Sequence, residues 1–208
     1  LTSILGYLNL IKDKKFENEE QMMEYINIAY NKSEKLKLLI DELFEYTKLS
    51  GEGIKLNLSN IALNELLGQL IEEFVPIFEE NNVLIIKDIA KEDIIAEVDG
   101  DKLVRVLENL IMNAIRYSYK PGDIKIGLYQ EEEYGIFYVK NRGENIPKGD
   151  LNKLFDRFYR VEKSRSESTG GSGLGLAISK NIVKLHGGDI WAECEGNEIT
   201  FYVKLKSK

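Results

Sequence analysis

Residues 169–178 read TGGSGLGLAI, and the fold assignment depends on this glycine-rich run. Four glycines within six residues lead into a helical pattern of apolar positions: Leu174, Ala177, Ile178, Ile182 and Leu185. Glycine lets the backbone approach a ligand closely. A helix that begins there offers unpaired N–H groups and the positive end of its dipole to an anion. The run therefore predicts a phosphate cradle, with an ordinary loop closure as the alternative.

A second informative motif covers residues 101–118 and predicts a helix. Asn109 and Asn113 are four residues apart and share a face, and Arg116 and Tyr117 follow one turn later. Asparagine is a poor residue for a helix interior, so two on one face suggest a polar task. An amide oxygen suits Mg²⁺, arginine neutralises phosphate, and tyrosine offers a wall to a base or ribose. The alternative is a solvated face with two incidental asparagines.

Together with two segments between them, these motifs resemble the sensor histidine kinases. Residues 109–118 (NLIMNAIRYS) are similar to the N box of that family, and residues 170–176 (GGSGLGL) to its G2 box. Residues 139–147 (VKNRGENIP) resemble the G1 box, and residues 154–160 (LFDRFYR) the F box. Their order and spacing resemble the Bergerat-type (GHKL) ATP-binding domain, over roughly residues 54–206.

The resemblance implies a site for Mg-ATP. It places Asn113 on the metal ion and gives Asn109 and Arg160 catalytic roles. The nucleotide-binding residues it implies are Asn109, Asn113, Arg116, Tyr117, Asn141, Gly143, Ile146, Tyr159, Arg160, Gly171, Ser172, Gly173, Leu174, Gly175 and Leu176. The serine-rich residues 157–172 would be an ATP lid that brings Arg160, Lys163 and Arg165 to the triphosphate.

The G1 segment departs from the family pattern D-x-G-x-G. This chain has Asn141, Gly143 and Asn145 at the three positions. Asn141 can accept a hydrogen bond from adenine only without the help of charge, and Asn145 lacks the backbone freedom of glycine. The pattern therefore predicts weakened nucleotide binding. The vancomycin-resistance sensor kinases of the VanS type are similar in this asparagine and in the lid, which favours that subgroup.

Residues 1–7 (LTSILGY) resemble the tail of the kinase H box, in which the phosphoaccepting histidine precedes the leucine by six residues. The resemblance implies that this chain begins after its phosphorylation site and cannot phosphorylate itself. The single histidine, His186, stands before Gly187 at the expected end of a helix. There a structural role is favoured over a phosphoacceptor role.

The first 50 residues predict a helical hairpin. Its first helix covers residues 1–13 and its turn residues 14–19. The second helix has an apolar stripe with alternating steps of four and three residues: Met22, Ile26, Ala29, Ser33, Leu36, Ile40, Leu43 and Thr47. A second stripe widens this surface beyond what one hairpin can bury. We therefore expect a four-helix bundle formed by two chains, with packing against the ATP domain as the alternative.

The expected fold class is α+β: the dimeric hairpin (1–50), a Ser-Gly-Glu-Gly linker, and a Bergerat-type α/β sandwich (54–208). Asp101 is expected to N-cap the asparagine-bearing helix, and Pro76 to kink or shorten the helix that contains it. The remaining expectations are strands at 55–58 and 83–88, hairpins at 125–130 with 135–140 and 189–193 with 198–206, and a helix at 173–186. These elements predict a mixed sheet covered by helices on one face.

Composition narrows the function classes. The chain has 208 residues and a net charge of −7, which argues against nucleic-acid binding. It contains neither a run long enough to span a membrane nor a signal peptide, and its one cysteine, Cys194, is expected in a strand as a small apolar residue. We expect the cytoplasmic fragment of a bacterial membrane sensor, attached to the membrane only through a missing N-terminal part. The expected partners are a second copy and a response-regulator receiver domain. Two alternatives are a GHKL ATPase of the chaperone, topoisomerase or mismatch-repair kind and a non-catalytic scaffold.

Overall fold

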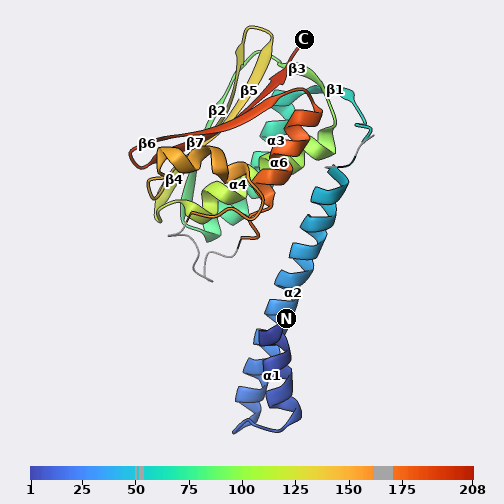
Figure 1. Cartoon of the computed structure of the whole chain (residues 1–208). Helices are drawn as coiled ribbons and strands as arrows, with labels where there is room; N and C mark the ends of the chain where they lie inside the picture. Colours follow the sequence, from blue (N-terminus) through green and yellow to red (C-terminus); the bar gives the residue numbers. More distant parts are fainter. Residues whose placement is uncertain (50, 52–53, 162–170) are drawn as a thin grey trace. The chain divides into compact units, whose positions relative to one another are not determined.

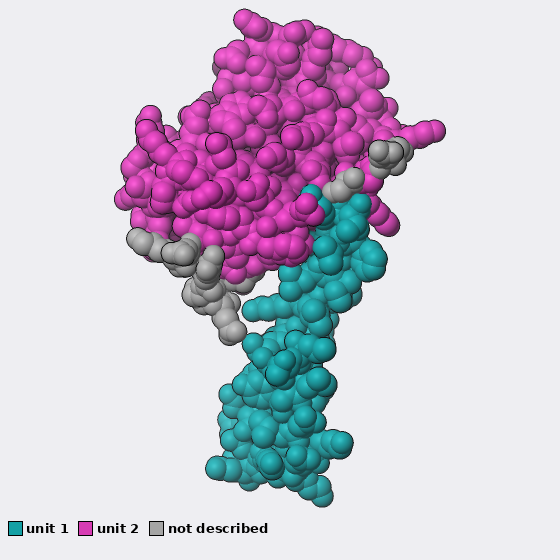
Figure 2. Space-filling view, viewed as in Figure 1, with its two compact units in different colours: residues 1–47 teal, residues 48–208 magenta. Residues whose placement is uncertain are grey.

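The computed structural model describes residues 1–49, 51, 54–161 and 171–208. It divides into two compact units, Leu1–Thr47 and Lys48–Lys208 (Figure 2). Ser50 and Gly53 of the predicted linker, and Lys163 and Arg165 of the predicted lid, lie outside the described residues. Among the described residues, no helix combines the length and apolar character that crossing a membrane requires.

The first unit contains helix α1 (Thr2–Lys12) and most of helix α2 (Glu19–Leu49) (Figure 1). The two helices meet at the rings of Tyr7 and Tyr25, whose centroids are 5.4 Å apart. Within the predicted stripe of α2, Ala29 is buried, whereas Ile26 is 38%, Ile40 45% and Leu43 45% exposed.

The second unit is built on a five-stranded sheet with the order β2-β4-β5-β7-β6. Its strands are β2 (Val83–Ile89), β4 (Gly122–Glu131), β5 (Tyr134–Arg142), β6 (Asp189–Glu195) and β7 (Glu198–Lys206). Strands β2 and β4 are parallel and the other neighbours are antiparallel, so the sheet is mixed, as predicted. Strands β1 (Ser59–Ala62) and β3 (Ile95–Val98) form a separate antiparallel pair.

Three long helices cover one face of this sheet: α3 (Leu63–Glu80), α4 (Gly100–Tyr117) and α6 (Gly175–Leu185) (Figure 1). The short helices α5 (Lys148–Leu151) and η1 (Asn152–Phe155) follow β5. Alternate strand residues such as Phe137 and Val203 are buried, together with Leu107 and Leu110 of α4. This packing fixes α4 and α6, which carry the two motifs first singled out in the sequence.

Several predicted boundaries are wrong. The first strand begins at Ser59 rather than at residue 55, because its partner is β3, a strand that sequence reasoning missed. Asp99, not Asp101, caps α4, since the helix begins at Gly100 and the Asp99 carboxylate accepts the Lys102 N–H. Pro76 does not shorten α3, which continues to Glu80.

The helix after the glycine run also begins later than predicted. It starts at Gly175, because Gly173 has a φ of +74°, a left-handed conformation that a right-handed helix cannot contain. It ends at Leu185 and is C-capped by His186.

Candidate functional site

Asp99 is the point at which three segments meet. Its Oδ1 accepts the N–H of Lys102 at 3.2 Å, and its Oδ2 accepts the N–H of Asn57 at 3.0 Å. Its own N–H donates to Nε2 of His186 at 3.0 Å. The start of α4 is therefore tied to the end of α6. As a consequence, the C-terminal half of α4 lies beside the start of α6, where the glycine run is.

His186 has the structural role that the sequence predicts. Its Nδ1 lies 2.8 Å from the carbonyl oxygen of Ile182, one helical turn earlier. Because Nε2 accepts from Asp99, the proton of a neutral ring is on Nδ1 and donates to that carbonyl. Both ring nitrogens are thus engaged within the protein.

Asn109 connects α4 to the first turn of α6. Its Nδ2 donates to the carbonyl oxygen of Gly175 and to Oγ of Ser179, each at 3.2 Å. Ser179 is fully buried and donates in turn to the same carbonyl at 3.0 Å. A Cβ at Gly175 would lie 3.3 Å from Oδ1 of Asn109, so the glycine allows this close approach.

The polar face of α4 continues through Asn113, Arg116 and Tyr117. Asn113 is half-buried, and its amide makes no hydrogen bond to any residue that the structure describes. Arg116 is exposed and lies against Gly171, where an added Cβ would be 2.9 Å from its Nη1 and 3.9 Å from the Tyr117 hydroxyl. The backbone at Gly171 is therefore brought onto the face that carries the second asparagine.

Residues 158–160 contact the glycine run from the other side. The N–H of Phe158 donates to the carbonyl oxygen of Gly173 at 2.9 Å, and a Cβ at Gly173 would lie 2.9 Å from the Phe158 Cα. Nη1 of Arg160 donates to the carbonyl oxygen of Gly171 at 3.3 Å. Ser172 Oγ accepts the N–H of Leu174, which is fully buried, while Leu176 is half-buried. The two segments form one loop cluster beside α4.

The end of β5 reaches the same place. Gly143 forms an antiparallel bridge with Ser118, and a Cβ on it would be 2.5 Å from the Tyr117 carbonyl oxygen. Asn141, two residues earlier, is only 3% exposed. Its Nδ2 and the Ser118 Oγ are both buried, and neither has a hydrogen-bond partner in the part of the chain that the structure covers. Sequence reasoning missed Ser118, whose only signal was its place at the end of the N-box motif.

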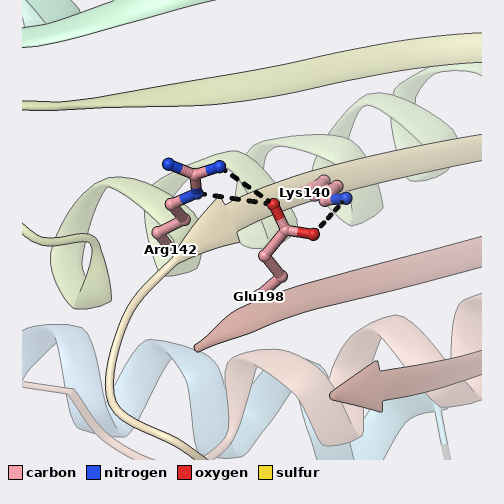
Figure 3. A network of polar contacts seen from close by, with 3 residues as sticks. All are labelled: Lys140, Arg142 and Glu198. Atoms are coloured by element: carbon pink, nitrogen blue, oxygen red, sulfur yellow. Dashed lines mark hydrogen bonds and ion pairs between the residues drawn. The ribbon is translucent and has the colours of Figure 1, made fainter. Parts of the chain in front are cut away.

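The strand around Asn141 is held from the opposite face of the sheet (Figure 3). Glu198 of β7 binds Lys140 at 2.6 Å through Oε2 and Arg142 at 3.4 Å through Oε1. The hydrogen bond from Lys140 is the main cause that lowers the pKa of the Glu198 carboxyl. The two cations flank Asn141 in sequence, so this network fixes the strand end on which the buried amide lies.

Ile146 and Tyr159 are placed by contacts of their own. The Ile146 N–H donates to Sγ of Cys194 at 3.5 Å, and the Cys194 thiol lies 3.4 Å from Oδ1 of Asn145. Cys194 lies in β6, as predicted, but it is half-exposed rather than a core residue. Asn145 has no positive φ, so the glycine that it replaces is not required by the backbone here. A hydrogen bond from Tyr159 is the main cause that lowers the pKa of Asp150.

Metal binding at this site would need oxygen ligands other than a carboxylate cluster. No group of three or more His, Cys, Asp and Glu side chains is arranged for a metal ion among the described residues. Mg²⁺ commonly takes one or two protein oxygens and completes its shell with phosphates and water. The unengaged amide of Asn113 fits that mode.

Comparison with known proteins gives consistent results. The family described as "Histidine kinase-, DNA gyrase B-, and HSP90-like ATPase" matches residues 98–207. Sensor protein VanSC of Enterococcus gallinarum is 40% identical, over 99% of this chain and 56% of that protein. Sensor histidine kinase WalK of Bacillus subtilis is 35% identical, over 100% of this chain and 35% of that protein. The chain thus spans between about a third and just over half of these relatives' length.

Among solved structures, histidine kinase ThkA in complex with response regulator TrrA superposes with a TM-score of 0.81 at 28% identity. The match covers 100% of this chain and 57% of that one. Histidine kinase AdeS of Acinetobacter baumannii gives a TM-score of 0.78 at 24% identity, over 99% of this chain and 93% of that one. At that identity the second likeness concerns the fold alone.

Proposed function

This chain belongs to the sensor histidine kinases, within the family of histidine kinase-, DNA gyrase B- and HSP90-like ATPases. From this premise, we propose that it binds Mg-ATP for phosphoryl transfer to a histidine. One observation carries the proposal. The asparagine-bearing face of α4 meets the glycine backbone of residues 171–175 at the start of α6. That arrangement brings amides, a guanidinium and free helix N–H groups together, which is what a polyphosphate requires.

The triphosphate would bind to the start of α6. Gly171, Ser172, Gly173, Leu174, Gly175 and Leu176 supply its backbone, and Arg116 and Arg160 supply positive charge near Gly171. Tyr117, Asn141, Gly143, Ile146 and Tyr159 would surround the base and ribose. Since the whole chain is acidic, these local donors must supply the attraction for the anion.

Asn113 would hold the Mg²⁺ ion through its amide oxygen, together with the phosphates. When bound, the ion neutralises charge on the phosphate oxygens. Asn109 and Arg160 are the proposed catalytic residues. Asn109 orients the first turn of α6, and Arg160 places a cation at Gly171. The protein's contribution is positioning and charge neutralisation, as in other phosphoryl transfers.

The proposed acceptor is a histidine outside this chain, because both ring nitrogens of His186 are engaged with backbone groups. From that histidine the phosphoryl group would pass to an aspartate of a response-regulator receiver domain. The ThkA structure, solved with its response regulator, supports this kind of partner. We propose residues 1–50 as the dimerisation and phosphoacceptor hairpin without its acceptor histidine, and residues 54–208 as the catalytic domain of a VanS-like membrane sensor.

The test measures thermal unfolding of the chain with and without Mg-ATP. We expect nucleotide at about 100 times its Kd to stabilise the protein by about 2.7 kcal/mol. Asn113→Ala should abolish the dependence on Mg²⁺ and leave the unliganded melting curve unchanged, since that amide makes no hydrogen bond to a described residue. An exposed asparagine outside the site, Asn60, provides the control Asn60→Ala.

Two outcomes would count against the proposal. A melting curve that saturating Mg-ATP does not shift would favour a scaffold that keeps the fold without binding nucleotide. Labelled phosphate that moves from ATP onto this chain would disprove the prediction that it cannot phosphorylate itself. Transfer to a response regulator should appear once the chain is extended by the residues of a complete H box.

A further inference from the structure

Two buried polar groups lie unpartnered at the junction of α4 and β5. They are Nδ2 of Asn141 and Oγ of Ser118, and neither has a hydrogen-bond partner among the described residues. A buried amide N–H₂ without an acceptor is unfavourable, because it has given up its hydrogen bonds to water and gained none in return. Such groups in a folded protein are commonly completed by a ligand or by water. Two of them at one junction therefore point to a molecule that has polar atoms at its edge.

The register places both groups on one face. Ser118 and Gly143 oppose each other in an antiparallel bridge, so the Ser118 side chain lies on the face to which a side chain at position 143 would point. Asn141 is two residues before Gly143 and points to the same side of β5. Ser118 and Asn141 are thus diagonal neighbours, typically roughly 7 Å apart between their Cα atoms, which leaves room for one edge of a planar ligand.

The side chains of Asn141 and Ser118 can each both donate and accept hydrogen bonds. A carboxylate only accepts hydrogen bonds, whereas an asparagine amide carries one acceptor and one N–H₂ donor group. A serine hydroxyl donates and accepts, and its proton rotates to suit the partner. Adenine presents an amino donor at position 6 and an acceptor at N1, and a 6-oxopurine presents the reverse. Turning the amide by half a rotation matches either base.

We propose that Asn141 and Ser118 read the position-6 edge of the base, and that this site accepts 6-oxopurine nucleoside triphosphates nearly as well as ATP. The proposal rests on the nucleotide site proposed above. It assigns Ser118 a role in contacting the base. It also gives a functional consequence to the asparagine at position 141, where the family pattern has aspartate. The pair would leave the 6-substituent of the base unselected.

The test compares Mg-ATP with Mg-ITP by isothermal titration calorimetry. ITP differs from ATP only along the edge in question and lacks the 2-amino group of GTP, so no extra bulk enters the comparison. We expect the wild-type Kd values to agree within about fivefold. Asn141→Asp should strengthen ATP binding about fivefold and weaken ITP binding about tenfold, because its charged acceptor favours the amino group and repels the 6-oxygen.

Three further variants keep the test decisive if a buried aspartate impairs folding. Asn141→Leu keeps the size of the side chain and removes its polar atoms, so both nucleotides should bind about tenfold more weakly. Ser118→Ala should weaken both by about threefold to tenfold. Asn60→Asp makes the same charge change on the exposed strand β1, where Asn60 Oδ1 accepts from Lys208, and should alter neither affinity.

The outcomes separate this inference from the function on which it rests. Wild-type protein that binds ATP but discriminates against ITP by more than about fiftyfold would overturn the inference and leave nucleotide binding intact. The same holds if Asn141→Leu and Ser118→Ala leave both affinities unchanged. Wild-type protein that binds neither nucleotide would overturn the proposed function together with the inference.

Discussion

His186 accepts the N–H of Asp99 with one ring nitrogen and donates to the Ile182 carbonyl with the other. The hydrogen bonds of His186 to described residues go to Asp99 and Ile182 rather than to the loop cluster, and they join the end of α6 to the start of α4. Since the two asparagines lie further along α4, the orientation of the candidate site depends on this remote bond. His186 thus positions the asparagines of α4 without itself belonging to the proposed nucleotide site.

The first prediction at this scale concerns that bond. His186→Ala leaves the Asp99 N–H without its acceptor in a place where the Asp99 residue is 7% exposed. We expect a loss of about 1–3 kcal/mol in the free energy of unfolding, measured as a lower urea midpoint at unchanged slope. Lys184→Ala, at an exposed position two residues earlier, is the control. An unchanged midpoint for His186→Ala would show that water replaces the imidazole at no cost.

Individual residues were only partly predictable from sequence. The contacts of Asn109, Arg116 and Arg160 with Gly175 or Gly171 join the motifs that the sequence had singled out. Whether the site residues act as proposed stays a prediction. Ser118 was missed because a serine at the end of a helix has no distinctive pattern. Its significance comes from a bridge to Gly143, a residue 25 positions away in sequence.

At the scale of elements, the sheet has one face that the long helices do not cover. Its aromatic side chains form a row across four strands: Tyr129 of β4, Tyr138 of β5, Tyr202 of β7 and Trp191 of β6. The Tyr138 ring lies over Gly127, where a Cβ would be 2.3 Å from the ring. The Tyr138 hydroxyl donates to Asp88 of β2, which also binds Lys125 at 2.7 Å. Tyr138 thus links the strand of Asn141 to the edge strand.

This arrangement predicts that the free energy of unfolding depends on pH in the alkaline range. Burial, followed by the hydrogen bond to Asp88, raises the pKa of Tyr138 to about 12 from its ordinary value of 10.0. A group whose folded pKa is raised contributes stability that is complete below its unfolded pKa. That contribution is lost as the pH rises through the folded pKa. Unfolding free energy should therefore fall between pH 10 and about 12.

Ultraviolet titration of the tyrosines checks this directly. The wild-type curve should contain a step near pH 12 that is absent from Tyr138→Phe, and the variant should lose less stability over the same range. Tyr119→Phe, at an exposed tyrosine, is the matched control. A curve in which Tyr138→Phe removes a step near pH 10 instead would contradict the predicted shift.

Helices and strands were predictable where the sequence pattern of a single continuous segment was enough to define them. The hairpin of β4 and β5 and that of β6 and β7 were confirmed, because alternation and a short turn are both local. Strand β3 was missed since its four residues follow the charged stretch Lys91–Asp93 and are stabilised by pairing with β1. The start of α4 was misplaced by two residues, because Asp99 and Asp101 are both acceptable caps and only the packing distinguishes them.

At the scale of the whole molecule, the two units differ in how far they bury their apolar residues. The sheet unit buries most of its large apolar residues. In contrast, the helical unit exposes many of them: Leu5, Leu8, Met23, Ile26, Tyr30, Leu38, Leu39, Ile40, Leu43 and Phe44. Several of these continue the stripe with steps of four and three residues. A stripe of this kind is typical of helices that pack against other helices.

The stripe consists of two rows of residues seven apart, which differ in burial. In the row Met22, Ala29, Leu36 and Leu43, only Leu43 is exposed, at 45%. Ile26 and Ile40 belong to the other row, together with Ser33 and Thr47, and this row is exposed. We infer that the second row is the part of α2 that a second copy would cover. Leu38, which is 62% exposed, lies on the opposite side of the helix.

The last prediction tests this assembly. Ile40→Glu should convert dimers into monomers, because a carboxylate without a partner would be buried in the helix seam. Leu38→Glu introduces the same group on the far side and should leave the dimer intact. Analytical ultracentrifugation over a range of concentrations gives the masses, and circular dichroism verifies that both variants keep their helices. If the wild-type chain is monomeric at the highest concentration, residues 1–47 do not dimerise by themselves, and Mg-ATP binding by the second unit should be unaffected. If Leu38→Glu dissociates the dimer and Ile40→Glu does not, the interface lies on the other side of α2.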